Sequence, residues 1–236
     1  MRTGMADRHF LETAYDLETT EQVRAHYEAW STTYDTEIEE ENNYAQPARC
    51  ATALASTLTP DGVRVLDVGC GSGLSGLALR EVGFTAIDGC DLSPAMLELA
   101  GETGVYDHLF EADMNQLLEP PHSTYDAVTA VGVFSFGHLK ATVLRGLLAV
   151  LRPGGALVIG LNDHFWDEGS IPAELNSIEA DGTAEVVFRE HGDHLPGAGI
   201  EGWVVVLSKL GTPPEPDLPP PVQPLSSGHA ANQTVP

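Results

Sequence analysis

The stretch RVLDVGCGSGLSG, residues 64–76, decides the fold of this chain. A short apolar run ends at Asp67, and four glycines then fall within eight positions. Glycines between a strand and a helix let the backbone approach a nucleotide closely. Read from Gly71, GSGLSG satisfies the G-x-G-x-x-G pattern of dinucleotide sites. Read from Asp67, DVGCGSG fits another class of nucleotide, so the ligand class is open at this point.

The loop contains no lysine, and the pattern GxxxxGK[ST] is absent from the chain. This excludes a Walker-type NTPase, because the lysine that neutralises phosphate is missing. Asp67, at the end of the first strand, would repel a pyrophosphate and would favour a ligand that carries an ammonium or a sulfonium. The helix start at Leu74–Ser75 offers N–H groups to an anion such as a carboxylate. The alternative is that Asp67 only caps the loop.

Two further acids are expected at strand ends. In IDGCDLSPAMLELA, Asp91 closes the second strand and is placed to accept hydrogen bonds from ribose hydroxyls, with Asp88 as the alternative. Asp113, in FEADMNQL, ends the third strand, where a carboxylate can hold the amino group of adenine. The alternative for Asp113 is a turn-capping role.

Apolar, β-branched runs alternate with helix-length segments between residues 62 and 209. This pattern predicts an α/β fold, with a mostly parallel sheet covered by helices on both faces. The last two runs, AEVVFRE and GWVVVLSK, have no clear helix between them and predict an antiparallel edge. Ligands of such sheets bind at the carboxyl ends of the strands.

Three regions are expected along the chain. Residues 1–58 form an N-terminal helical cap, in which Thr19 and Gln22 have the spacing of a capping box. Residues 59–210 form the ligand-binding core. Residues 211–236 hold half of the chain's 16 prolines and little that is apolar, so we expect a disordered Pro-rich tail.

The composition limits the partners. Eleven basic residues against 35 acidic ones give a net charge of −24, which opposes nucleic-acid binding. No apolar run approaches the about 20 residues of a membrane span, and the N-terminus does not resemble a secretory signal. Three cysteines without C-x-x-C spacing indicate reduced thiols. We therefore expect an acidic, cytoplasmic protein that binds neither nucleic acid nor membrane, as a monomer or homodimer.

The motifs in this order resemble the class I S-adenosylmethionine-dependent methyltransferases, over roughly residues 20–209. VLDVGCGSG is similar to the first motif of that superfamily, CDLSPAML to its ribose segment, EADM to its adenine segment, and YDAVTAVGVF and VLRPGGALVIG to its fourth and fifth strands. The resemblance implies a Rossmann-like seven-stranded sheet of order 3-2-1-4-5-7-6 with strand 7 antiparallel. It implies S-adenosyl-L-methionine as cofactor and S-adenosyl-L-homocysteine as product.

The N-terminal HYEAWSTTYD is similar to a helix of the small methyltransferase-like proteins named after the Williams–Beuren syndrome chromosome region. In that helix Tyr34 is expected to contact the cofactor carboxylate or a cation, while Trp30 has core packing as an equal alternative. The cofactor-binding residues that the resemblance implies are Tyr27, Trp30, Tyr34, Asp67, Gly69, Cys70, Gly71, Gly73, Leu74, Asp91, Leu92, Ser93, Met96, Ala112, Asp113, Met114, Val131, Gly132 and Val133.

Motifs that the sequence lacks reduce the range of possible methyl acceptors. No [DN]PP[YFW] follows the fourth strand, no cysteine has a PC context, and no cluster resembles the magnesium site of catechol O-methyltransferases. A small-molecule methyl acceptor, attacked by direct in-line displacement, is the best interpretation. No catalytic residue is assigned; candidates for the acceptor pocket are Tyr34, His138, Asn162, His164 and Trp166. His191 and His194 do not make a metal site by their spacing, so no metal is expected.

Two other functions remain open. An NAD(P)-dependent oxidoreductase would use the same glycine loop but leaves Asp67 unexplained. A non-catalytic S-adenosylmethionine-binding module would act through protein partners and would transfer nothing. An oxidoreductase would bind NADH and not S-adenosylhomocysteine. A binding module would bind S-adenosylhomocysteine but transfer no methyl group, so an assay of methyl transfer distinguishes it from an enzyme.

Overall fold

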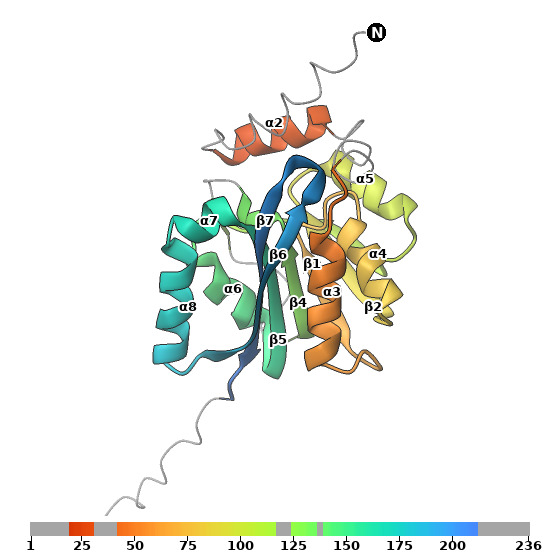
Figure 1. The fold of residues 1–236 in the computed structure, drawn as a ribbon. Helices are drawn as coiled ribbons and strands as arrows, with labels where there is room; N and C mark the ends of the chain where they lie inside the picture. Colours follow the sequence, from red (N-terminus) through yellow and green to blue (C-terminus); the bar gives the residue numbers. More distant parts are fainter. Residues whose placement is uncertain (1–18, 31–41, 117–123, 136–138, 212–236) are drawn as a thin grey trace, which may run out of the picture.

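One seven-stranded sheet, of order β3-β2-β1-β4-β5-β7-β6, forms the centre of the computed structural model of this chain (Figure 1). The structure describes residues 19–30, 42–116, 124–135 and 139–211. Its strands are β1 Arg64–Val68, β2 Ala86–Asp91, β3 His108–Glu111, β4 Tyr125–Val131, β5 Leu151–Asn162, β6 Ala184–Leu195 and β7 Ile200–Lys209. Its helices are α2 Thr20–Trp30, α3 Gln46–Thr57, α4 Leu74–Glu81, α5 Pro94–Glu102, α6 Val143–Val150, α7 Asp163–Asp167 and α8 Ser170–Ala180, with short 3-10 turns at η3 Val133–Ser135 and η4 Pro196–Ala198.

The strand directions confirm the predicted Rossmann-like fold. Strands β1 to β5 pair in parallel, and β7 runs antiparallel to both β5 and β6. The chain order reverses between β1 and β4, which are neighbours in the sheet. The loops after these two strands therefore turn to opposite faces and leave a crevice at the carboxyl end of the sheet. The division into cap, core and tail stays a prediction, and residues 212–236 lie outside the described part.

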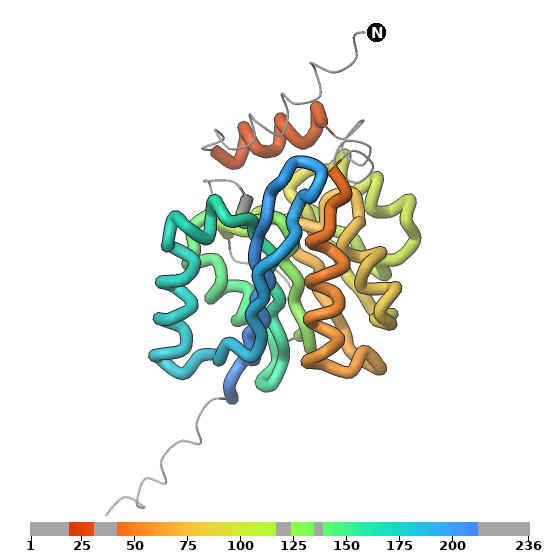
Figure 2. Tube along the Cα trace, viewed as in Figure 1, coloured from red at the N-terminus to blue at the C-terminus, as the bar shows by residue number. Residues whose placement is uncertain are grey.

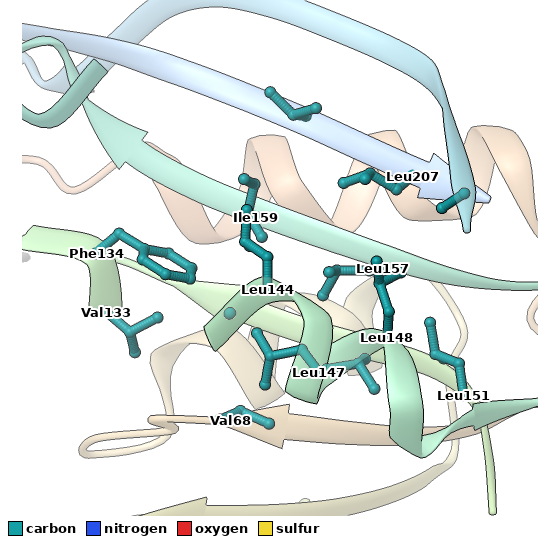
Figure 3. Packing of buried hydrophobic residues seen from close by; sticks show 14 of the residues in the cluster. Val68, Val133, Phe134, Leu144, Leu147, Leu148, Leu151, Leu157, Ile159 and Leu207 are labelled. Atoms are coloured by element: carbon teal, nitrogen blue, oxygen red, sulfur yellow. The ribbon is translucent and has the colours of Figure 1, made fainter. Parts of the chain in front are cut away.

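The alternation of strand side chains supplies two cores. On one face, Val65 of β1 and Val158 of β5 pack against α3 and α4. On the other face, Leu66 of β1 and Leu157 of β5 pack with residues of α6 and α8. Figure 3 shows α6 laying Leu144, Leu147 and Leu148 against this second face, with Val133 and Phe134 at one end of the cluster. The amphipathic α6 thus packs in one cluster with Val133 and Phe134, the residues that follow β4 in η3.

Helix α2 lies across the carboxyl ends of the parallel strands, above the tip of the β6–β7 hairpin (Figures 1 and 2). Its start has the predicted capping box, since Thr19 Oγ1 accepts from the N–H of Gln22 and the Gln22 side chain accepts from the N–H of Thr19. Trp30 is only 2% exposed and packs with Leu195 at that tip. An ion pair from Arg24 to Glu111 connects the helix to β3.

Transmembrane segments were sought among the helices of the described ranges. None of these helices combines the length and the apolar character needed to cross a bilayer.

The contact between β5 and α3 depends on a missing side chain at Gly160. A Cβ atom there would lie 2.6 Å from the Cys50 sulfur and 2.7 Å from Nε2 of Gln46, both buried. Gly160→Ala should therefore lower the free energy of unfolding by about 1–3 kcal/mol, the usual effect of overpacking. Gly146 in α6 has open space at its Cβ position, so Gly146→Ala should raise that free energy by about 0.5–1 kcal/mol. Urea denaturation checks both; equal effects would contradict the close contact.

Candidate functional site

The glycine loop joins β1 to α4 in a conformation that side chains rarely adopt. Gly69, Gly71 and Gly73 have φ angles of 67°, 52° and 104°. The N–H groups of Gly69 and Cys70 both donate to the carbonyl of Cys90, at 2.7 and 3.0 Å. A Cβ at Gly69 would lie 2.0 Å from a methyl carbon of Val133. Position 69 thus requires glycine both for its positive φ angle and because Val133 lies where a side chain would stand.

Asp67 lies beneath this loop and has no exposed surface. Its carboxylate accepts hydrogen bonds from three hydroxyls: Ser75 at 2.5 Å, Thr129 at 2.6 Å and Tyr106 at 2.8 Å. Burial raises the pKa of Asp67, and the three hydroxyls act in the opposite direction. Asp67 does stand at the loop entrance, as predicted. Because it is fully buried, its side chain cannot contact a ligand directly. It can act on a ligand only through its negative charge and by holding the glycine loop in place.

Asp91 joins the glycine loop to the start of α5. One carboxylate oxygen accepts from the N–H of Gly71 at 2.9 Å, and the other accepts from the N–H of Ser93 at 2.9 Å. Ser93 caps α5 by accepting from the N–H of Met96. Desolvation raises the pKa of Asp91, and the backbone N–H groups oppose the shift.

The structure separates Asp88 from Asp91. Asp88 is buried and accepts from the Arg64 guanidinium at 2.7 Å and from the Tyr125 hydroxyl at 2.8 Å. These contacts occupy the Asp88 carboxylate inside the sheet, whereas Asp91 lines a cavity at the strand ends. The geometry favours Asp91 as the carboxylate available to a ligand.

Two hollows meet at the carboxyl ends of β1, β2 and β4. The strand-end cavity is lined by Val23, Tyr27, Gly69, Gly71, Asp91, Leu92, Asp113, Met114, Val131, Gly132, Val133 and Leu139. The loop recess shares three of these residues and is lined by Tyr44, Pro47, Gly69, Cys70, Gly71, Ser72, Leu74, Ser75 and Val131. Among the described lining residues of both hollows there are two carboxylates and no lysine or arginine.

Most of the sequence-predicted cofactor residues meet in these two hollows. The members that line them are Tyr27, Gly69, Cys70, Gly71, Leu74, Asp91, Leu92, Asp113, Met114, Val131, Gly132 and Val133. Trp30, Asp67, Gly73, Ser93, Met96 and Ala112 are not among the lining residues of either hollow. Trp30 and Met96 are buried in packing, as the core alternative for Trp30 anticipated. Tyr34 lies outside the described residues.

Several lining residues were missed from the sequence. Val23 lies one helical turn before Tyr27, so the same periodicity could have identified it. Tyr44 has no such signal. Its hydroxyl lies 2.4 Å from where a Cβ of Gly132 would stand, which makes Gly132 the glycine that admits Tyr44 over the end of β4. Leu139 and Ser72 likewise belong to no motif that the sequence displays.

The three described acceptor-pocket candidates lie outside these two hollows. Asn162 is buried and caps α7, where its Oδ1 accepts from the N–H of Phe165. His164 is exposed on α7. Trp166 stacks on Trp203, with ring centres 4.4 Å apart. None of these three lines the strand-end cavity or the loop recess as the described residues define them. His138 lies outside the described residues.

The two histidines considered for a metal, His191 and His194, have different surroundings. His191 contacts the Asp163 carboxylate at 2.9 Å, and Glu201 lies close enough that a ligand atom of each falls within 4.8 Å of the others. All three are at least partly exposed. His194 is buried, and its burial lowers its pKa to about 4. The absence of a metal site stays a prediction.

Comparisons with known proteins agree with this geometry. Residues 65–155 match the family described as Methyltransferase domain. The chain is 31% identical over 179 residues to methyltransferase-like protein 27 of Homo sapiens, covering 73% of this chain and 72% of that protein. It is 33% identical over 154 residues to a ubiquinone biosynthesis O-methyltransferase of Marinobacter nauticus, with 59% and 64% covered. It is 28% identical over 180 residues to a probable 18S rRNA (guanine-N(7))-methyltransferase of Dictyostelium discoideum, with 63% and 61% covered.

The buried Asp67 carboxylate should leave a pH signature on stability. Because its pKa is raised in the folded state, the folded protein holds this proton more tightly than the unfolded chain does. Its contribution to stability is therefore greatest below the ordinary pKa of about 3.9 and falls as pH rises toward the raised value. Asp67→Asn removes this dependence, so the variant should gain stability relative to wild type as pH increases from about 4. Urea denaturation of both proteins at several pH values checks this prediction. If the free energies of unfolding of wild type and Asp67→Asn change with pH in parallel, the pKa of Asp67 is not raised.

Proposed function

The chain belongs to the class I S-adenosylmethionine-dependent methyltransferases, and we propose that it moves the methyl group of S-adenosyl-L-methionine directly to a small-molecule acceptor. The observation that carries the cofactor assignment is the strand-end cavity itself. It combines a glycine loop with carboxylates after β2 and β3, and no basic side chain lines its described part. Such a cavity favours a ligand with a positive centre and hydroxyl donors.

The lining residues fit the cofactor's chemistry in three places. Asp91, at the end of β2, would accept from the ribose hydroxyls. Asp113 would hold the adenine amino group, with Leu92 and Met114 as apolar walls. The loop recess, with Tyr44 and the glycine loop on its walls, would take the amino-acid end. Asp67 and Asp91 together place negative charge beside that region.

Bound S-adenosylmethionine supplies an electrophilic methyl carbon on a sulfonium. The chain's own task is then to orient the donor, exclude water and admit the acceptor in line. Val23 and Tyr27 of α2 close the cavity from above, and Val133 and Leu139 form its wall after β4. A general base is needed only for an acceptor that still holds its proton at neutral pH.

The charge distribution supports this function over the alternatives. A pyrophosphate would lie among carboxylates with no lysine or arginine in the described lining, which disfavours NAD(P). A net charge of −24 opposes a polyanionic acceptor. The Marinobacter relative is named for a small-molecule reaction, whereas the Dictyostelium relative is named for an rRNA reaction. A test of the acceptor class must therefore include RNA as a possible acceptor.

Asp91→Ala should weaken S-adenosylhomocysteine binding by about 1–3 kcal/mol, or about 5- to 150-fold, for lost charge-assisted hydrogen bonds. Asp88→Ala is the matched control. It removes a buried carboxylate from the same strand and should lower thermal stability without changing this affinity. Isothermal titration calorimetry measures both; an unchanged affinity in Asp91→Ala would overturn the ribose assignment.

The acceptor class is tested by methyl transfer from labelled S-adenosylmethionine to fractionated cell extract. We expect label in fractions of small molecules and none in purified rRNA or protein. Label in RNA would replace the small-molecule proposal. Cofactor binding without label in any fraction would favour a binding module.

A further inference from the structure

A second cavity adjoins the strand-end cavity and shares Leu139 with it. This side cavity, of about 240 Å³, lies between Phe134 of η3, residues 139–141 just before α6, and the α7–α8 junction. It is lined by Phe134, Leu139, Lys140, Ala141, Phe165, Glu168, Ser170 and Ile171. Neither the sequence motifs nor the cofactor assignment accounts for it.

The floor of the side cavity is apolar. Phe134, Phe165 and Ile171 are buried members of the core cluster that α6 and α8 form with the sheet. An engineered apolar cavity of about 150 Å³ binds benzene. The side cavity, at about 240 Å³, is therefore large enough for one ring with substituents.

The rim carries an unpaired cation. The ammonium of Lys140 has no carboxylate, carbonyl or aromatic partner within the described part of the chain. All other described basic residues have one: Arg24, Arg49, Arg64, Arg80, Arg145, Arg152, Arg189 and Lys209. In a chain with 35 acids against 11 bases, a lysine beside an apolar cavity with no partner among the described residues is unexpected on charge grounds.

Glu168 also lines the side cavity and forms no ion pair with Lys140 among the described residues. It is exposed, so water screens its repulsion of an anion. A ligand that is apolar in its body and carries both an anionic group and a hydrogen-bond donor matches this lining. A neutral hydrocarbon would leave the Lys140 ammonium and the Glu168 carboxylate without a partner in the ligand.

We propose that the side cavity is the acceptor pocket, and that the acceptor is a small carboxylic acid with one ring-sized apolar body. Its carboxylate pairs with Lys140, and its ring rests on Phe134, Phe165 and Ile171. Because Leu139 belongs to both cavities, a ring seated here lies next to the wall of the donor site. The inference rests on the proposed function, since it takes the strand-end cavity as the place of the methyl donor.

Binding tests this without any turnover. The probes are 4-hydroxyphenylacetate and its amide, which have nearly the same shape and differ in charge. Each is titrated into the full chain saturated with S-adenosylhomocysteine, using wild type, Lys140→Met and Lys140→Arg. We expect wild type to prefer the acid by about five-fold or more, the scale of a partly exposed ion pair. Lys140→Met should lose the preference, and Lys140→Arg should keep it.

The affinity for S-adenosylhomocysteine serves as the internal control and should be equal in all three proteins. Absence of that affinity would refute the proposed function itself. With that affinity intact, three results would overturn the acceptor pocket alone: neither probe binds, the acid and the amide bind equally to wild type, or Lys140→Met keeps the preference for the acid.

Discussion

The carboxylate of Asp67 is the interaction on which the site depends. It accepts hydrogen bonds from the hydroxyls of Ser75 in α4, Tyr106 before β3 and Thr129 in β4. One buried group therefore connects three separate parts of the chain beneath the glycine loop. The Tyr106 hydroxyl also accepts from the N–H of Gly76 in α4. A buried charge with three donors has a fixed place, which explains how a loop of small residues keeps its conformation.

The sheet and the loop could be predicted because both depend on local pattern. Strand runs and helix-length segments predicted a mostly parallel sheet with an antiparallel edge. The resemblance to the methyltransferases implied the strand order, which the structure has. The sequence favoured Asp91 over Asp88 because Asp91 closes the strand, but it did not show what occupies Asp88. Its partners are Arg64 and Tyr125, which reach Asp88 from β1 and β4.

The remaining differences come from contacts between distant segments. Asp67 was expected beside the ligand, but its three hydroxyl partners enclose it. Tyr44 was missed because its place over Gly132 is set by the path of the chain before α3 and not by any motif. The acceptor candidates after β5 were chosen by position alone. In the structure, Asn162 caps a helix and Trp166 stacks on Trp203, while the neighbouring Phe165 lines a cavity.

The central claim is that this glycine loop and its acids accept a cationic nucleoside and reject a pyrophosphate. Calorimetric titration of the full chain with S-adenosylhomocysteine, followed by competition with NADH, tests it most directly. We expect saturable binding at one site per chain, with no displacement by NADH. Saturable binding of NADH, without heat from S-adenosylhomocysteine, would contradict it.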